Sequence, residues 1–233
     1  MHTIRMNHPG KNALSSDLMA WLDVEFERAG AEPILLTGSG DAFCAGLNLK
    51  EVASLDAAGM ERFVRHIDRL AVRLFDHPAP VVCAINGHAI AGGAVLAACC
   101  DWRVATNDAK ARIGANEVAL GVCFPPAILR IMAHRIPVQH HAGVLLGAGL
   151  FSSTAALAVG LVDEVAGDVE AAATQKLAAL AAHPRDAYAH TKAQLRAGIT
   201  RVSAADEARF RERELPIWTS DAVRQRVLAV LKR

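Results

Sequence analysis

An uncharged stretch from Pro78 to Cys100 constrains the fold of this chain most strongly. It contains no Asp, Glu, Lys or Arg. A segment of this length has to be shielded from water, either by lipid or by the rest of a folded domain. Pro80, Asn86-Gly87 and Gly92-Gly93 divide it into pieces typical of a strand, a turn and the start of a helix. We therefore predict a buried part of an α/β core and no membrane partner.

Hydrophobic periodicity predicts helices and strands along the rest of the chain. Apolar side chains recur at helical spacing in residues 15–29 and 60–75, and a short apolar run at 33–38 is typical of a buried strand. Nearly every pattern from Asp168 onward is helical. The sequence thus predicts an α/β region at 1–165 followed by an all-helical region at 166–233. Further strands are expected at 81–85, 103–105, 111–113 and after Gly160, and further helices at 92–100, 126–135 and 138–147.

Charge and cysteine content exclude several classes of protein. The chain has 25 Lys and Arg residues against 24 Asp and Glu residues, so no basic surplus indicates a nucleic-acid partner. Its five cysteines are odd in number and form no C-x-x-C pair, which favours free thiols in a reducing compartment over a zinc site or a disulfide framework. The amino-terminal residues contain no apolar segment of an export signal. We expect a cytoplasmic protein without a metal.

Two small-residue positions offer backbone N–H groups for catalysis. Gly46-Leu47 follows a predicted strand, and Gly92-Gly93 begins a predicted helix, where the first N–H groups have no intrahelical partner. Glycine allows a substrate carbonyl to approach the backbone closely. If the two positions converge, their N–H groups form an oxyanion hole. Considered separately, each is also what a tight turn requires.

The same residues carry a resemblance to a known family. The stretches "GKNALS", "ILLTGSGDAFCAGLNL", "AINGHAIAGGAVLAACCDWRVAT", "ARIGANEVALGV" and "LLGAGLFSSTAALAVGLVDEV" resemble, in order and spacing, the signature blocks of the enoyl-CoA hydratase/isomerase, or crotonase, family. The resemblance implies a crotonase-like spiral of strand-strand-helix units at 1–165, with the helical region at 166–233 serving oligomerisation and pocket closure. It also implies that the family's opening hairpin strand, expected before "HTIRMNHP", is missing or shortened.

The resemblance further implies an acyl-CoA thioester as substrate and a homotrimer or a dimer of trimers as the assembly. Coenzyme A would be part of the substrate, and no other cofactor is expected. The N–H groups of Leu47 and Gly92 would bind the thioester oxygen. Asn48 departs from the Asp that is common in the family at this position, and Lys50 could either meet the CoA phosphates or be solvated. The expected substrate-binding residues are Ala13, Ala45, Gly46, Leu47, Asn48, Leu49, Lys50, Gly92, Gly93 and Asn116, with Asn12 beside them.

Two downstream positions distinguish the reactions of this family. By the resemblance, hydratases use two glutamates, and these positions are Val95 and Glu117 here. A single carboxylate above an oxyanion hole suits a proton shuttle, which takes a proton from C2 of a 3-enoyl-CoA and returns it at C4. Burial should then raise the pKa of Glu117. The apolar residue at position 95 and the Asn116-Glu117 pair resemble 3,2-enoyl-CoA isomerases more than hydratases.

Two other functions stay open at this point. One is an enoyl-CoA hydratase or another enolate-forming enzyme, in which a different side chain replaces the lost glutamate. The other is a non-catalytic or RNA-binding protein on the same fold. Glu117 could also be a solvated loop carboxylate with no chemical role. An enoyl-CoA isomerase of acyl-CoA metabolism, with Glu117, Leu47 and Gly92 as its catalytic groups, is the function that the residues favour.

Overall fold

Two parallel β-sheets form the framework of the protein. The computed structural model describes residues 1–232. In the larger sheet every neighbouring pair is parallel, and the strand order is β1 (His2–Met6), β2 (Ile34–Gly38), β4 (Val81–Ile85), β6 (Trp102–Thr106) and β8 (Glu164–Ala166). The smaller sheet, also parallel, has the order β3 (Ala42–Cys44), β5 (His88–Ile90) and β7 (Ile113–Gly114).

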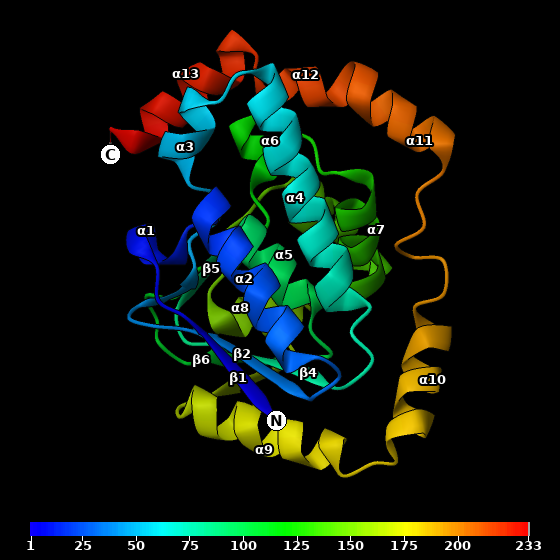
Figure 1. Ribbon diagram of the computed structural model, residues 1–233. Coiled ribbons are helices and arrows are strands. Elements are labelled where there is room, and N and C mark those ends of the chain that lie inside the picture. The colour runs from blue at the N-terminus through cyan, green and yellow to red at the C-terminus, as the bar shows by residue number, and fades with distance from the viewer. Residues whose placement is uncertain (233) are drawn as a thin grey trace.

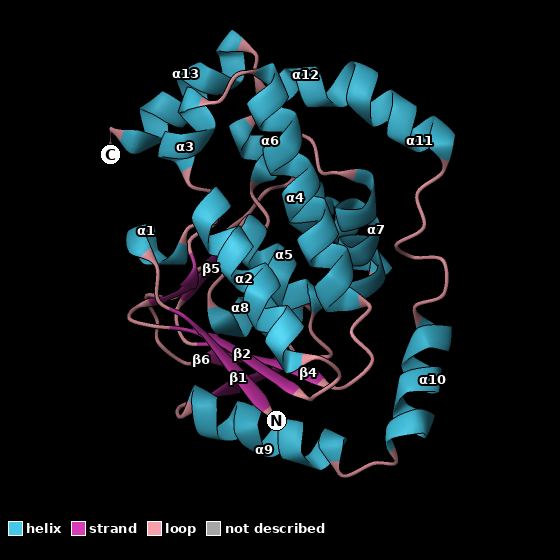
Figure 2. Ribbon diagram, in the orientation of Figure 1, coloured by secondary structure: helices cyan, strands magenta, loops and turns pink. Residues whose placement is uncertain are grey.

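The central strands β2 and β4 are buried on both faces, which explains their nearly continuous apolar sequences, whereas Thr3 and Arg5 of the edge strand β1 are exposed. One face packs on α9 (Val169–Ala181), and Figure 2 shows this helix along one side of the strands. The other face packs on a larger layer of helices. Alternation along each strand decides which residues meet which layer. Those packed with α9 are Leu35, Val82, Ala84 and Val104. The helices of the larger layer are α2 (Ser16–Ala29), α4 (Ala57–Phe75), α5 (Gly92–Cys99) and α7 (Pro126–Arg135).

The principal helices begin where the sequence provides caps. The Ser15 hydroxyl accepts a hydrogen bond from the N–H of Leu18, and the Asp56 carboxylate accepts one from the N–H of Gly59. The apolar stripe of α4, from Met60 to Phe75, is buried as its spacing predicts. The predicted helices at 15–29, 60–75 and 126–135 are confirmed, as is the strand at 81–85 followed by the helix at Gly92.

The carboxyl-terminal third of the chain forms an arc of helices around the core. Figure 1 shows this arc running from α9 through α10 to α13. At its end α13 contacts α3 and α6, two short helices of the α/β region. The remaining helices are α1 (Pro9–Asn12), α3 (Leu49–Ser54), α6 (Glu117–Leu120), α8 (Ser153–Ala158), α10 (Arg185–Leu195), α11 (Ala204–Arg209), α12 (Leu215–Trp218) and α13 (Asp221–Leu231), with a π-helical segment at Phe210–Glu214.

Two predicted elements differ from the structure. The helix expected at 138–147 is a 3₁₀ turn at Val138–His140 followed by a π-helical segment at Ala142–Leu146, because two glycines in this region weaken a regular α-helix. The strand expected at 111–113 begins only at Ile113, since the Ala111 N–H is used in a turn with Asp108.

The uncharged stretch and the cysteines have the environments expected of a buried core. No helix within residues 1–232 is long and apolar enough to cross a membrane. All five cysteines are free thiols, and Cys123 is the one that is only half-buried. At the amino-terminal side, β1 is an edge strand that pairs with β2.

Candidate active site

The carboxyl ends of the three short strands bring the candidate residues together. In the smaller sheet Ala89 pairs with Cys44 on one side and with Ile113 on the other. Because the strands are parallel, their carboxyl ends lie at the same edge of the sheet, which is where ligands of parallel sheets usually bind. Each strand is followed within three residues by one of the predicted catalytic groups. These groups are Leu47 after β3, Gly92 after β5 and Glu117 after β7.

The backbone around Leu47 leaves its N–H group free. Leu14 donates its N–H to the Gly46 carbonyl at 2.6 Å and accepts the Asn48 N–H at 2.8 Å. These two bonds form a parallel bridge on one side of Leu47, so the Leu47 N–H points to the other side. It has no hydrogen-bond partner within residues 1–232. Gly46 has a φ of +95°, a conformation that favours glycine, which explains the small residue predicted to matter here.

The second N–H group lies at the amino end of α5. Gly92 is the first residue of this helix, so its N–H has no intrahelical partner and lies at the positive end of the helix dipole. A Cβ on Gly92 would be 3.4 Å from a methyl group of Leu47, which places the two donor residues next to each other. A Cβ on Gly93 would overlap the carbonyl oxygen of Cys44. Gly93 is therefore needed for α5 to approach the end of β3, whereas a Cβ at position 92 would meet only side-chain atoms of Leu14 and Leu47.

Glu117 is a buried carboxyl group with one unpartnered oxygen. Its side chain is 5 % exposed, and no hydrogen bond reaches Oε2 within the described residues. Burial raises the pKa of Glu117 to about 8, because the loss of water disfavours the charged form. The predicted rise in pKa is confirmed, and the alternative of a solvated loop carboxylate is wrong. A carboxyl group with this pKa can both accept and donate a proton near neutral pH.

Val95 supplies no second acid or base. It lies in the interior of α5, is 2 % exposed and packs within the main apolar core. The side chain at the family's first glutamate position thus contributes to packing. Within residues 1–232, no group of three or more His, Cys, Asp or Glu side chains is placed to hold a metal ion.

The predicted substrate-binding residues occupy the loop that leads into α3 and its neighbours. Asn48 caps α3, because its side-chain oxygen accepts the N–H of Glu51, a role that Asn fills as well as Asp. Lys50 is exposed on α3, and Ala13 is half-buried one residue before Leu14. Asn116 directly precedes Glu117, and its Oδ1 is buried without a partner. Ala45, Gly46, Leu47 and Leu49 belong to the same loop and helix start as Asn48, and Gly92 and Gly93 face this loop.

Sequence reasoning missed the residue that connects both halves of the site. The Leu14 backbone bonds to both neighbours of Leu47, and a Leu14 methyl group lies 2.6 Å from the position of a Cβ on Gly92. Leu14 is fully buried. Nothing in the local pattern of "GKNALS" separates this leucine from an ordinary core residue, because its role depends on contacts with residues 46, 48 and 92.

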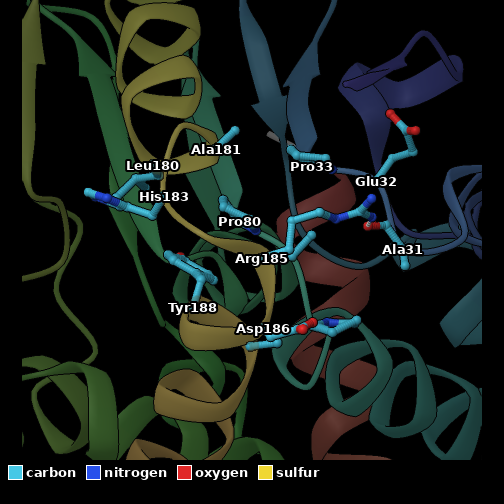
Figure 3. Close-up of a pocket in the computed structure, with 13 residues that line it drawn as sticks. Ala31, Glu32, Pro33, Pro80, Leu180, Ala181, His183, Arg185, Asp186 and Tyr188 are labelled. Atoms are coloured by element: carbon cyan, nitrogen blue, oxygen red, sulfur yellow. Dashed lines mark hydrogen bonds between the residues drawn. The ribbon is translucent and has the colours of Figure 1, made fainter.

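The structure also contains a cavity that lies away from the candidate active-site residues. It has a volume of about 450 Å³ and lies at the amino ends of β2 and β4, beside α9 and α10. Figure 3 shows Pro33, Pro80 and Tyr188 among the residues that line it. None of the predicted site residues lines this cavity.

The chain belongs to the enoyl-CoA hydratase/isomerase family. The sequence profile of that family matches residues 1–221, which is nearly the whole chain. The fold is the crotonase fold of this family, as the sequence predicted.

Some relatives of the chain are named as isomerases and others as hydratases. It is 32% identical over 167 residues to the mitochondrial enoyl-CoA delta isomerase 1 of Mus musculus, a match that covers 70% of this chain and 58% of the mouse protein. It is 38% identical over 153 residues to a putative enoyl-CoA hydratase of Thermus thermophilus, covering 64% of this chain and 58% of that protein. The chain thus spans less than two thirds of the length of these relatives.

Solved structures resemble the chain over nearly its full length. The crystal structure of human mitochondrial delta3-delta2-enoyl-CoA isomerase superimposes with a TM-score of 0.91 at 26% identity, covering 99% of this chain and 92% of that one. A probable enoyl-CoA hydratase of Mycobacterium tuberculosis gives a TM-score of 0.79 at 31% identity, covering 99% and 90%.

Proposed function

We propose that this protein isomerises 3-enoyl-CoA thioesters to 2-enoyl-CoA thioesters. The observation that carries the proposal is the buried carboxyl group of Glu117, whose Oε2 has no partner, at the same sheet edge as the free N–H groups of Leu47 and Gly92. An apolar Val95 replaces the second glutamate that the family resemblance assigns to hydratases. The similarity to proteins named delta isomerases supports the same reaction.

The reaction would proceed through a dienolate. The thioester oxygen accepts hydrogen bonds from the N–H groups of Leu47 and Gly92, and the Glu117 carboxylate removes a proton from C2. The electron pair of the broken C–H bond moves toward the thioester oxygen, where the two donors stabilise the negative charge. Glu117 then returns the proton to C4, and the double bond that was between C3 and C4 lies between C2 and C3. No atom is gained or lost.

The helical region would close the pocket over these groups. α13 contacts both α3, which follows Leu47, and α6, which begins with Glu117. Exclusion of water would strengthen the electrostatic interactions of the site and withhold the reactant that hydration requires. Pocket closure by residues 166–233 therefore favours isomerisation over hydration.

A trimer, or a dimer of trimers, is the assembly that we propose. Within its own chain α10 buries only Lys192, and Leu195 at its end is 70% exposed. A helix with so little intramolecular packing is suited to contact a second copy. Light scattering at several protein concentrations tests this, and a monomer at all of them would contradict it. A cytoplasmic location stays a prediction from the free thiols.

A panel of 2-enoyl and 3-enoyl-CoA thioesters tests the reaction. We expect 3-enoyl substrates to give 2-enoyl products and 2-enoyl substrates to undergo little hydration, with products identified by double-bond position. Glu117→Gln should lower isomerase turnover by about 10³-fold, within the range of general acid-base catalysis, while binding of the thioester persists. Unchanged turnover in this variant would contradict the role of Glu117.

The competing reaction is hydration of a 2-enoyl-CoA. The specific observation in its favour is the 38% identity to a protein named as a putative hydratase. Rapid formation of a hydroxyacyl-CoA from the 2-enoyl substrates would favour it and would mean that Val95 does not prevent hydration. The same panel therefore separates the two functions.

A further inference from the structure

A left-handed turn immediately precedes the site. Gly10, Lys11 and Asn12 have φ values of +71°, +60° and +58°. This conformation is unfavourable for residues with a side chain, although Asn tolerates it better than most. Consecutive left-handed residues persist only where the surrounding structure holds them, and such segments cluster at functional sites. The contacts that hold this turn therefore indicate its purpose.

The side chain of Asn12 locks the turn onto β3. Its Nδ2 donates to the carbonyls of Ala42 and Phe43 at 3.1 and 3.2 Å, and its Oδ1 accepts the N–H of His8 at 2.8 Å. The residue is 2% exposed. Two hydrogen bonds thus connect the turn to the strand that leads to Leu47, and the third joins Asn12 to His8 across the turn.

The residues around Asn12 then hold the loop on both sides of Leu47. The Lys11 carbonyl accepts the N–H of Ala45 at 3.0 Å, and the Leu14 backbone bonds to Gly46 and Asn48. The backbone segment at 11–14 therefore contacts positions 45, 46 and 48, and it leaves the Leu47 N–H without a partner among residues 1–232. The side chain of Leu14 extends from the same segment to Gly92. One short piece of backbone touches both halves of the oxyanion hole.

We propose that the left-handed turn, locked by Asn12, is a positioning device for the oxyanion hole. Asn12 touches no reacting atom; it sets the direction of the Leu47 N–H through the segment at 11–14, which also contacts Gly92. This inference rests on the proposed use of the two N–H groups. Loss of the lock should weaken stabilisation of the enolate more than it weakens binding of the thioester, because the hole would be displaced and the rest of the pocket would remain.

Asn86 provides a matched control. Its Nδ2 also donates to two backbone carbonyls, those of Gly40 and Ala42, and its Oδ1 accepts the N–H of Gly38. The bonding pattern is similar, and both side chains donate to the Ala42 carbonyl, but Asn86 lies outside the segment at 11–14 whose backbone bonds to residues 45, 46 and 48. If Asn12 serves only stability, its substitution and that of Asn86 should change kcat to a similar extent. A positioning role predicts a catalytic effect at Asn12 only.

The test compares Asn12→Gly with Asn86→Gly in the full-length protein. Glycine preserves the left-handed backbone at position 12 and removes all three side-chain bonds. We expect Asn12→Gly to lower kcat about 10²-fold, as for a displacement of about 1 Å in a catalytic group, with a change in KM of less than about threefold. Asn86→Gly should leave kcat within about threefold of the wild type. Equal effects on kcat would overturn the proposal.

A spectroscopic measurement separates this inference from the proposed reaction. Acetoacetyl-CoA forms an enolate with its own ultraviolet absorption, so the band of the bound probe reports on the oxyanion hole without turnover. We expect the band in the wild type and in Asn86→Gly, and a weaker band in Asn12→Gly and in Asn12→Asp, which keeps the acceptor for His8 and serves if the glycine variant is unstable. An unchanged band in both Asn12 variants would overturn the positioning role. A wild type that forms the enolate without isomerising 3-enoyl-CoA would overturn only the proposed reaction.

Discussion

The two ends of α5 differ in whether the buried polar groups near them have hydrogen-bond partners. At the amino end, the Gly92 N–H has no partner in its own helix, and the nearby site contains Glu117 without a partner at Oε2. Beyond the carboxyl end, Asp101 accepts hydrogen bonds from Lys192 and Arg196 at 2.7 Å each. All of these groups are largely withdrawn from water.

The pKa values show the same difference. Burial raises the pKa of Glu117 to about 8, with no cation to oppose it. In a second buried ion pair, joined to Asp101 through Arg135, Asp163 accepts hydrogen bonds from Arg103. Burial would also raise the pKa of Asp163, but the hydrogen bonds and the charge of Arg103 outweigh it, and the net shift is downward. The end of α5 with the free Gly92 N–H and Glu117 is where the proposed reaction would take place, and the end with the Asp101 ion pairs is where the helical region attaches to the core.

Removing the Asp101 carboxylate, which pairs with Lys192 and Arg196, should have the largest effect on stability. Asp101→Asn leaves Lys192 and Arg196 buried without their carboxylate, which should lower the free energy of unfolding by about 3–5 kcal/mol. Urea denaturation measures this. Glu170→Gln is the control, since the Arg5–Glu170 pair is exposed and its loss should cost less than about 1 kcal/mol. Equal losses of unfolding free energy in the two variants would mean that the buried Asp101 ion pairs contribute no more to stability than an exposed pair.

The pH dependence of stability should reveal the unpaired carboxyl group. The folded-state pKa of Glu117, about 8, lies above the ordinary value of 4.5 for this group. Between these values the folded chain retains a proton that the unfolded chain has lost, so the contribution is fully present below pH 4.5 and is lost as pH rises to about 8. We expect this decline, of the order of a few kcal/mol, as the difference between the wild type and Glu117→Gln, because other groups with shifted pKa values, such as Asp68, titrate in both proteins. Parallel urea midpoints in the two proteins across this range would contradict it.

A smaller effect is expected from moving the loop that carries Leu47 away from the start of α5, where Gly92 lies. The Cβ of Gly93→Ala would meet the carbonyl oxygen of Cys44, which belongs to backbone and has little freedom to move. The loop after β3 would shift from α5, and kcat/KM should fall about 10²-fold in protein that is still folded. Gly143→Ala is the control, since its Cβ would meet no atom within 4 Å. A fully active Gly93→Ala would show that the contact between α5 and β3 is not required.

The long elements could be predicted because their patterns are local. The stripe of α4 and the apolar run of β4 each repeat over enough residues to define a helix or a strand. The strands of the smaller sheet have two or three residues, so periodicity does not define them. The left-handed turn at Gly10–Asn12 was missed for a similar reason, since its conformation is maintained by bonds to residues 42 and 43, far along the chain.

The sequence by itself determined the family, the main helices and strands, and the residues able to do the chemistry, because glycines, caps, apolar spacing and the identity of positions 95 and 117 are properties of the chain. The tertiary structure alone decided that Leu47, Gly92 and Glu117 share one edge of a sheet, and that Glu117 loses its water. Both depend on strands that are distant in sequence and meet only on folding. The pKa of Glu117 and the availability of the Leu47 and Gly92 N–H groups depend on contacts between segments that are far apart in the sequence.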